Sequence, residues 1–427
     1  MNKDRKKIIR SWKMYDWANS AFATTIMAAV LPEFYSSVAG AALDKTIATS
    51  YWGYSNTISM LIIAVTAPIL GAIADHSGTK KIFLGGFVII GVLSTALLLG
   101  VGSGMWFYAS LFYILGRIGF AGGNIFYDSL LPHVARPDEI DRVSAGGYAY
   151  GYMGGGILLI INLLMILKPA YFGIPNAEWG SRISFLTVAI WWAVFSIPIF
   201  KNVSEPVSFI YKGESTNPLL AGYQRLKKTF KDIRRFKELV KFLLAFWIYN
   251  DGVGTIIIMA VIFGAEIGIG RFHLIGAILL VQILGVPFTL IFGRLPKRIG
   301  TKKSILLALG VYAIIAFLGY FMKNPLHFWL LAILVSMVQG GTQALSRSMY
   351  GSMSPPTKSA EFFGFYNVSS KFAGIVGPFL FGVVGQLTGT SRISIVAIVI
   401  FFFVGALILA TVDHEKGIQA ARSDDER

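Results

Sequence analysis

Apolar runs long enough to cross a membrane recur almost from one end of the 427-residue chain to the other. A helix needs about 20 mainly apolar residues to span a bilayer, and only 14% of this chain is charged, against roughly 25% in soluble domains. In lipid, a single segment must satisfy its own backbone hydrogen bonds, so the runs predict helices. We expect twelve of them, at residues 16–38, 51–74, 82–101, 105–128, 145–167, 182–200, 241–264, 272–292, 304–322, 327–349, 362–386 and 392–412. The sequence therefore predicts an all-α membrane protein with twelve transmembrane helices.

The positive charge of the chain predicts its orientation. Most of the 38 Lys and Arg residues fall in the ends and connections that an even helix count places on one side. Cytoplasmic loops attract positive charge, so we expect a multi-pass protein of the cell membrane with both termini in the cytoplasm. The net charge of +16 forms no groove-sized basic patch, which argues against nucleic acid as a partner; the lipid bilayer is the partner expected.

One long polar connection divides the chain. Residues 201–240 separate a six-helix bundle at 1–200 from a second at 241–412, followed by a cytoplasmic tail at 413–427. Within this linker Tyr223, Leu226 and Phe230 follow helical spacing beside several basic residues. This pattern is typical of an amphipathic helix on the anionic inner leaflet, and a solvated linker is the alternative.

Several functional classes have no support in the sequence. Cysteine is absent and the five histidines show no metal-ligand spacing, so we expect no metal site and no cofactor. A glycine- and lysine-containing phosphate loop is also missing, which argues against an ATP-driven pump. The basic start and the apolar run 21–31 resemble a signal peptide, but Asp16, Asn19 and Pro32 interrupt or flank it. We expect the segment to be retained.

The chain contains an internal repeat. The segment 71–81 contains Gly71 and Gly78 and ends in two lysines. It reappears at 293–303, with Gly293 and Gly300 at the equivalent positions. Both copies close the second helix of a six-helix half. Two parallel halves related by an axis along the membrane normal describe transporters in which the halves rock around a central site. The first copy resembles the motif between helices two and three of the major facilitator superfamily, and the resemblance covers nearly the whole chain.

This resemblance implies a conformational latch. Gly71 and Gly78 permit close approach and a tight turn, while Asp75 can face a helix N-terminus or a basic side chain across the interface between halves. An ordinary tight turn is the alternative interpretation. The copy departs from the family pattern at His76 and Thr79, where arginine is common. The expected latch residues are Gly71, Asp75, Gly78, Lys80, Lys81, Asp128, Gly293 and Gly300, with Lys80 and Lys81 among lipid headgroups.

A narrower resemblance lies in the first and seventh helices. The segments 12–25 (WKMYDWANSAFATT) and 247–256 (WIYNDGVGTI) look like signature segments of the fungal autophagy-related vacuolar amino-acid effluxers and their bacterial relatives. The resemblance implies a small-molecule substrate, with neutral amino acids the expected class.

Charged and polar residues within the helices are candidates for the transport site. Asp16 and Asn19 share one face of the first helix. Asp251 lies about ten residues into its helix, roughly 15 Å deep, where a charge is costly and usually functional. It can pair with Lys371, either as a permanent salt bridge or as a pair remade when substrate or a proton binds. The remaining substrate or proton-coupling candidates are Arg117, Asn124, Tyr127, Asn250 and Gln343.

Three functions remain open at this stage. The first is a secondary active transporter that exports neutral amino acids by alternating access, coupled to protons, and acts as a monomer. The second exports amphiphilic drugs or lipids, which the 14% aromatic content would suit. The third is a membrane receptor or enzyme on the same fold, but no nucleophile with a base and no sensing domain supports it, so we expect no enzyme.

Overall fold

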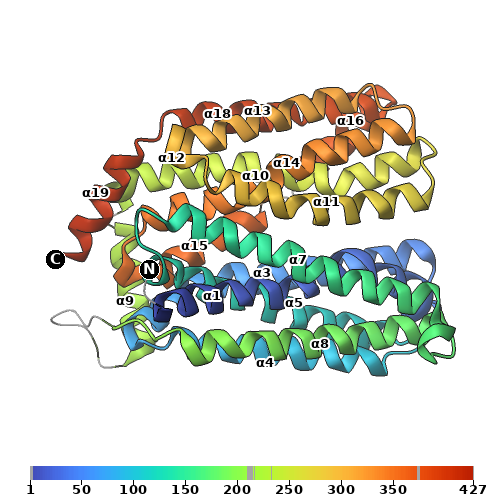
Figure 1. Cartoon of the computed structure of the whole chain (residues 1–427), viewed down its shortest axis with the longest axis horizontal. Coiled ribbons are helices and arrows are strands. Elements are labelled where there is room, and N and C mark those ends of the chain that lie inside the picture. The colour runs from blue at the N-terminus through green and yellow to red at the C-terminus, as the bar shows by residue number, and fades with distance from the viewer. Residues whose placement is uncertain (1–2, 209–214, 216, 232, 373–375, 427) are drawn as a thin grey trace.

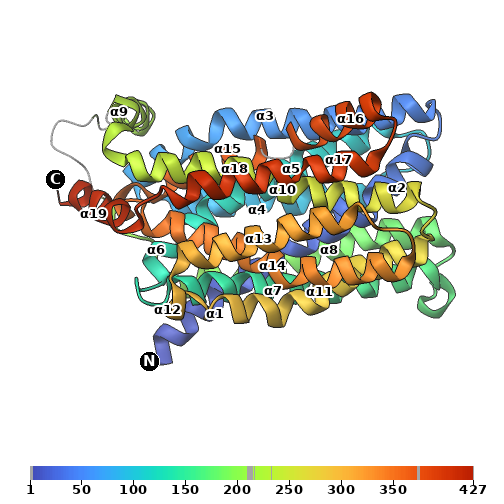
Figure 2. The same cartoon turned by 90° about the horizontal axis from the view of Figure 1, so that it is seen from above.

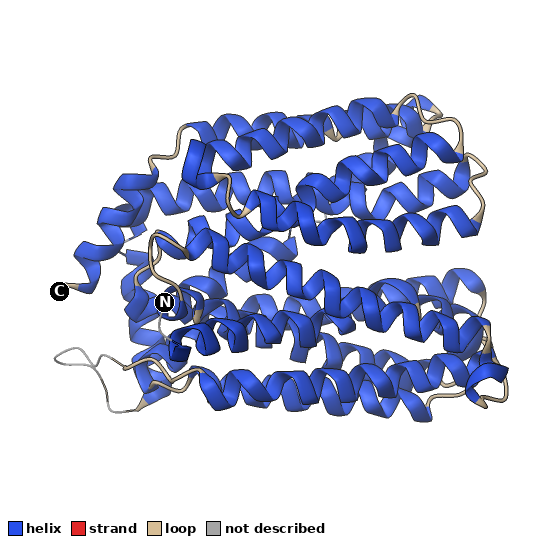
Figure 3. Ribbon diagram, viewed as in Figure 1, coloured by secondary structure: helices blue, strands red, loops and turns tan. Residues whose placement is uncertain are grey.

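The computed structural model describes residues 3–208, 215, 217–231, 233–372 and 376–426. Within these ranges the chain is helical throughout, with no strand (Figure 3). The long helices run side by side in two bundles, one from each half of the chain (Figure 1). This is the twelve-helix, two-bundle membrane fold that the sequence predicts.

The N-terminal bundle contains the first six spanning segments. The first is α1, which continues beyond Ala21 through π-helical turns and the short α2 to Ala39. The others follow in order, joined by short connections that include α6 (Leu131–Val134). They are α3 (Lys45–Ser77), α4 (Lys80–Leu97), α5 (Trp106–Ser129), α7 (Ile140–Leu167) and α8 (Ala177–Asn202).

The C-terminal bundle repeats this plan. Its eleventh span is described as α15 and α16, on either side of residues 373–375, and its twelfth is divided at Ile398. The segments are α10 (Lys237–Glu266), α11 (Arg271–Phe292), α13 (Thr301–Gly319), α14 (Pro325–Ser352), α15 (Ser359–Phe372) with α16 (Val376–Thr388), and α17 (Ser391–Ala397) with α18 (Val399–Ala410). The short α12 (Pro296–Ile299) connects α11 to α13.

Length and hydropathy alone identify ten membrane spans among the described residues. The other two fall short for different reasons. The helix α5 carries Arg117, Asn124 and Asp128, which lower its hydropathy. The eleventh span includes residues 373–375, which lie outside the described residues. Each bundle has its own apolar core, while side chains such as Val65 and Ile89 point outward at 67% and 60% exposure. Such outward apolar surface belongs in lipid.

Both termini lie at the same end of the molecule, which we call the termini end (Figures 1 and 2). The first helix begins at Lys3 rather than near residue 16, because the basic N-terminal segment continues the helix and buries Trp12 and Tyr15. The tail also differs from a simple extension. It forms α19 (His414–Asp425), whose Asp424 pairs with Lys358 at 2.5 Å.

The segment 201–240 contains α9 (Pro218–Lys231), which runs across the ends of the spanning helices at the termini end (Figures 1 and 2). Its buried side packs on α3 and includes Ala221, Arg225 and Thr229. Tyr223, on another side of the helix, is 60% exposed. The helix therefore packs against the protein through small and polar residues.

The two halves meet along pairs of helices from opposite bundles. α3 packs on α15, and α7 packs on α11 and α14. We use the word seam for the part of these contacts between the halves that lies at the termini end.

Candidate functional site

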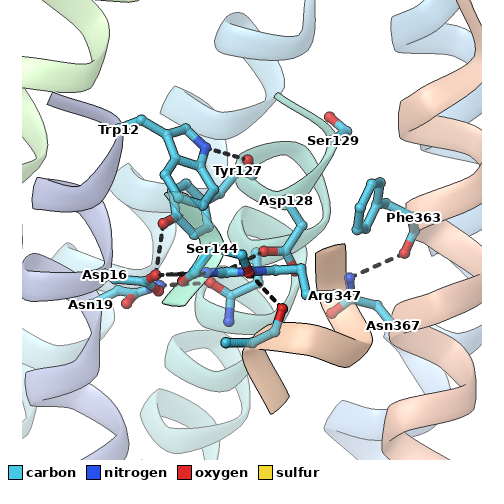
Figure 4. A network of polar contacts seen from close by, with 12 residues as sticks. Trp12, Asp16, Asn19, Tyr127, Asp128, Ser129, Ser144, Arg347, Phe363 and Asn367 are labelled. Atoms are coloured by element: carbon cyan, nitrogen blue, oxygen red, sulfur yellow. Dashed lines mark hydrogen bonds and ion pairs between the residues drawn. The ribbon is translucent and has the colours of Figure 1, made fainter. Parts of the chain in front are cut away.

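A single arginine from the C-terminal half is buried among groups of the N-terminal half (Figure 4). Arg347, on α14, lies 3.0 Å from a carboxylate oxygen of Asp128 on α5 and 3.3 Å from one of Asp16 on α1. It also donates to the hydroxyl and the carbonyl oxygen of Ser144 on α7, each at 2.9 Å. All these partners belong to the opposite bundle, so the ion pairs join the two halves.

Aromatic rings complete the surroundings of the guanidinium. Its central carbon lies 4.3 Å from the ring centre of Tyr148 and 4.9 Å from that of Trp12. Tyr127 also faces it and donates its hydroxyl to Asp16 at 2.7 Å. Cations over aromatic faces are stabilised when desolvated. Burial of this arginine is therefore compensated by two carboxylates, by hydrogen bonds and by three rings.

Close packing at this point requires glycine. A side chain at Gly147 would place its first carbon 2.4 Å from the Asp16 carboxylate and 2.9 Å from the guanidinium of Arg347. The glycine therefore allows α7 to approach the charged cluster, and its Cα faces the ion pair directly.

The charged cluster opens onto a central cavity of about 610 Å³ between the bundles. Both halves line it. Near the cluster the lining is polar, and the amide of Asn19 donates to Asn124 at 2.6 Å. The polar lining residues are Asp16, Asn19, Ser20, Thr24, Asn124, Asp128, Tyr148, Tyr152, Asn250, Gln282, Gln339, Gln343, Arg347, Tyr366 and Asn367. The cavity thus presents fixed charges of both signs together with several amides.

The rest of the wall is apolar and comes almost entirely from the C-terminal half. It is formed by side chains of α10, α11, α13, α14 and α17. Examples are Ile256, Met259, Phe263, Val281 and Leu331. The cavity is therefore divided into a charged, amide-rich part and an apolar part.

Five of the nine predicted substrate or proton-coupling residues lie on this lining: Asp16, Asn19, Asn124, Asn250 and Gln343. Tyr127 lies behind it, bonded to Asp16.

Two of the charged candidates, Asp251 and Arg117, do not line the cavity. Asp251 is 2% exposed and accepts the backbone N–H of Gly377 at 3.1 Å, between α10 and α16 and away from the cavity. Arg117 donates to Asn56 at 2.8 Å and to Tyr113 at 2.7 Å, within the N-terminal bundle. Depth along a helix does not determine which face a side chain occupies, and both face neighbouring helices. The side chain of Lys371, the expected partner of Asp251, lies outside the described residues.

Asp75 joins the halves at the termini end. Its carboxylate accepts the backbone N–H groups of Ala360 at 3.1 Å and Glu361 at 2.8 Å, at the start of α15. A carboxylate at a helix N-terminus satisfies unpaired N–H groups and interacts favourably with the helix dipole. Gly71 makes this approach possible, because a side chain there would come within 2.3 Å of the Ala360 carbonyl oxygen.

The two lysines of the motif, expected among lipid headgroups, both make contacts with the protein. Lys80 is 3% exposed, pairs with Asp75 at 2.9 Å and donates to Ser359 across the seam at 2.7 Å. Lys81 donates to the carbonyl oxygens of Phe200 and Val203 at the end of α8. Both therefore stabilise protein contacts, Lys80 between the halves and Lys81 within the first.

Asp128 and the glycines complete the set of predicted latch residues. Asp128 lies on the cavity and pairs with Arg347 rather than with the motif. Gly78 ends α3 in the left-handed region at φ 63°, which glycine adopts without strain. In the second copy Gly300 has φ 84° and Gly293 packs against Ala145.

The second copy lacks the aspartate cap, since Lys297 occupies the position equivalent to Asp75. At that side of the seam Asp141 of α7 instead accepts hydrogen bonds from Thr301 at 2.9 Å and Ser348 at 2.5 Å. The two halves are thus similar in backbone but differ in the chemistry of their contacts.

Sequence reasoning missed Arg347 as a site residue. A signal was present, because a charged residue inside a spanning helix is usually functional. Its partners could not be identified from sequence, since Asp16, Asp128 and Ser144 come from three helices of the other half.

Comparisons with known proteins agree with this architecture. The chain matches the family described as "Vacuole effluxer Atg22 like" over residues 4–422. It is 40% identical over 418 residues to YxiO of Bacillus subtilis (strain 168), described as an MFS-type transporter, covering 97% of each chain. It is 23% identical to Autophagy-related protein 22 of Saccharomyces cerevisiae (strain ATCC 204508 / S288c), covering 97% of this chain and 93% of that one.

Solved structures show the same fold at low sequence identity. The proton:xylose symporter XylE gives a TM-score of 0.72 at 14% identity, covering 98% of both chains. The transporter FucP in the outward conformation gives 0.68 at 12%, covering 96% of this chain and 98% of that one. With the family match across almost its whole length, this chain belongs to the Atg22-like family of major facilitator transporters.

Proposed function

We propose that this transporter exports neutral amino acids or similar small zwitterions by alternating access, with movement coupled to protons. The observation that carries the proposal is the position of Arg347 between Asp16 and Asp128 on the wall of the central cavity. A zwitterion carries a carboxylate that can bind the guanidinium and an ammonium group that can bind the released acids. Such a solute can replace the internal ion pairs without leaving a buried charge uncompensated.

Proton coupling follows from the same ion pairs. When a substrate carboxylate takes Arg347, Asp16 and Asp128 lose their shared cation. Burial of a carboxylate without a cation favours its protonated form. A proton can then bind one acid as the arginine moves to the substrate, and release of the substrate restores the ion pairs. In this scheme the amides of Asn19, Asn124, Asn250 and Gln343 orient the solute in the cavity.

The contacts at the seam indicate which state of the transport cycle the structure represents. Asp75, Gly71 and Lys80 hold the termini end closed. Since the basic ends and connections predict that the termini are cytoplasmic, the closed seam corresponds to an outward-facing state. Export then requires these contacts to break so that the cavity opens to the cytoplasm and takes up substrate.

Thermal stabilisation of the purified protein tests the substrate class. A ligand that binds only the folded state at 100 times its dissociation constant adds about 2.7 kcal/mol. We expect neutral amino acids to stabilise the parent. Arg347→Lys keeps the charge but loses the forked geometry that binds a carboxylate through two hydrogen bonds, so its response should be weaker. Asp251→Asn changes an acid away from the cavity and should respond like the parent.

An exporter of amphiphiles is the second candidate, supported by the apolar wall on the C-terminal half. The same panel separates the two. Stabilisation by amphiphilic cations but by no amino acid would contradict the zwitterion proposal. Uptake into proteoliposomes with and without a pH gradient then tests coupling, and equal rates would contradict a proton-coupled mechanism.

A further inference from the structure

One buried acid lies outside the transport cavity and has no role in the function proposed above. Glu361, in the first turn of α15, is 0% exposed. Neither of its carboxylate oxygens has a hydrogen-bond partner among the described residues. A buried polar group without hydrogen bonds is costly, and a buried charge much more so. Such a group needs an explanation.

The groups around Glu361 come from several elements that meet at the seam. Asp75, from α3, contributes a second negative charge, which is paired with Lys80 at 2.9 Å, while Arg225 of α9 and Lys358 before α15 are further cations nearby. The Thr229 hydroxyl of α9 also lies beside the carboxyl group. No ion pair within 4.0 Å joins Glu361 to a described cation. The backbone N–H groups that could stabilise a carboxylate here are bound by Asp75.

This arrangement favours the protonated form of Glu361 while the seam is closed. Desolvation, the largest effect, disfavours the charged form of an acid, and so does the Asp75 carboxylate. Thr229, Lys358 and Arg225 act in the opposite sense but do not outweigh the desolvation. When the halves separate at the termini end, water reaches the start of α15 and the ordinary tendency of a carboxyl group to ionise returns. Closure and proton binding at Glu361 are therefore linked in the thermodynamic sense: each favours the other.

The helix α9 is the element that covers this acid. It packs on α3 from one half, and its buried Arg225 and Thr229 approach α15 from the other. A side chain at Gly222 would lie 2.6 Å from Ile73, so the helix packs closely on the end of α3. The helix α9 thus lies on the end of α3 and brings Arg225 and Thr229 near the buried Glu361.

We propose that Glu361 is a second proton-binding site, covered by the linker helix α9, whose proton is held while the termini end is closed and released when it opens. The site deepens the proton coupling proposed above, but it rests on separate residues. It also assigns the linker a part in the transport cycle, because α9 must move relative to α15 for the proton to leave.

Accessibility of a single cysteine tests this proposal, and the chain has no natural cysteine to interfere. Gln343 lines the cavity, so Gln343→Cys reacts with a membrane-impermeant maleimide from the termini side only when that end opens. We expect the labelling rate to rise about fivefold or more between about pH 5.5 and pH 8, the range in which a destabilised carboxyl group loses its proton. Adding Glu361→Gln, which mimics the protonated form, should remove most of this rise.

Two comparisons make the outcome decisive. Glu415→Gln neutralises an exposed acid at the same end and should keep the full pH response. Thr229→Val, which preserves the shape of the side chain, tests the contact with α9 and should shift the response along the pH axis. If Glu361→Gln keeps the parent's pH response, the proposal is wrong. Amino-acid stabilisation is measured on the parent and on Glu361→Gln without the Gln343→Cys substitution, so failure of the substrate proposal is distinguishable from failure of this one.

Discussion

Replacement of Arg347 by glutamine should open the termini end and destabilise the protein. The arginine is 2% exposed and is the cation shared by Asp16 and Asp128. Removing one partner of a buried ion pair costs about 3–5 kcal/mol. If one of the acids takes up a proton instead, the cost is similar. The ordinary pKa of aspartate lies about three units below pH 7, and three units correspond to about 4 kcal/mol.

The cost falls on the closed state, because Arg347 belongs to one half and its partners to the other. A change of about 3–5 kcal/mol corresponds to a hundredfold or larger shift toward opening at the seam, at 1.4 kcal/mol for each factor of ten. Labelling of Gln343→Cys from the termini side measures the shift, and thermal unfolding measures the loss of stability. Adding Asp128→Asn removes one uncompensated acid and should recover about 1–3 kcal/mol.

Arg117→Gln is the matched control. Arg117 is also a buried membrane arginine, but its hydrogen bonds to Asn56 and Tyr113 stay within one bundle and involve no carboxylate. It should lose about 1–2 kcal/mol for two neutral partners and leave labelling at the seam unchanged. If Arg347→Gln costs no more than this control, or if Asp128→Asn recovers nothing, the reasoning about the shared cation is wrong.

Two further predictions concern the seam. Gly71→Ala should weaken the seam by about 1–3 kcal/mol through overpacking against Ala360. Gly86→Ala, where nothing lies within 4 Å, should be neutral or slightly stabilising. Equal labelling of Gln343→Cys in both variants would contradict this. Burial and the neighbouring Lys80 lower the pKa of His133 to about 3, so the unfolded chain binds a proton that the folded chain does not, and stability falls as the pH falls below about 6.5. His133→Gln should remove about 1 kcal/mol of the loss between pH 7.5 and 5.5, measured by thermal unfolding, and an unchanged pH profile would refute the assignment.

The sequence was sufficient for the fold because lipid imposes a simple rule on the backbone. Each spanning run must be helical and apolar, and the repeat of Gly71 and Gly78 at Gly293 and Gly300 indicated two similar halves. The contact of Asp75 with a helix N-terminus across the interface was also among the expectations. That expectation came from the resemblance of the segment 71–81 to the family motif, in which Asp75 lies in the last turn of its helix.

The candidate site was less predictable because it depends on contacts between distant helices. Asp251 was predicted from its depth along the helix, but its carboxylate faces Gly377 rather than the cavity. Arg347 was passed over, since its value as a site residue comes from Asp16 and Asp128 in the other half. A hydropathy pattern gives the position of a residue along a helix, and it does not give the angular face that packing selects.

The ion pairs of Arg347 also have a consequence for biogenesis. Synthesis proceeds from the N-terminus, so Asp16 and Asp128 enter the membrane before the tenth span that carries their cation exists. Until then the first bundle contains two acids with an unmet charge, each of which must stay hydrated or protonated. A first half made alone is therefore electrically incomplete, and insertion of α14 neutralises it. Assembly of the two halves therefore brings the cation of the second half to the two acids of the first.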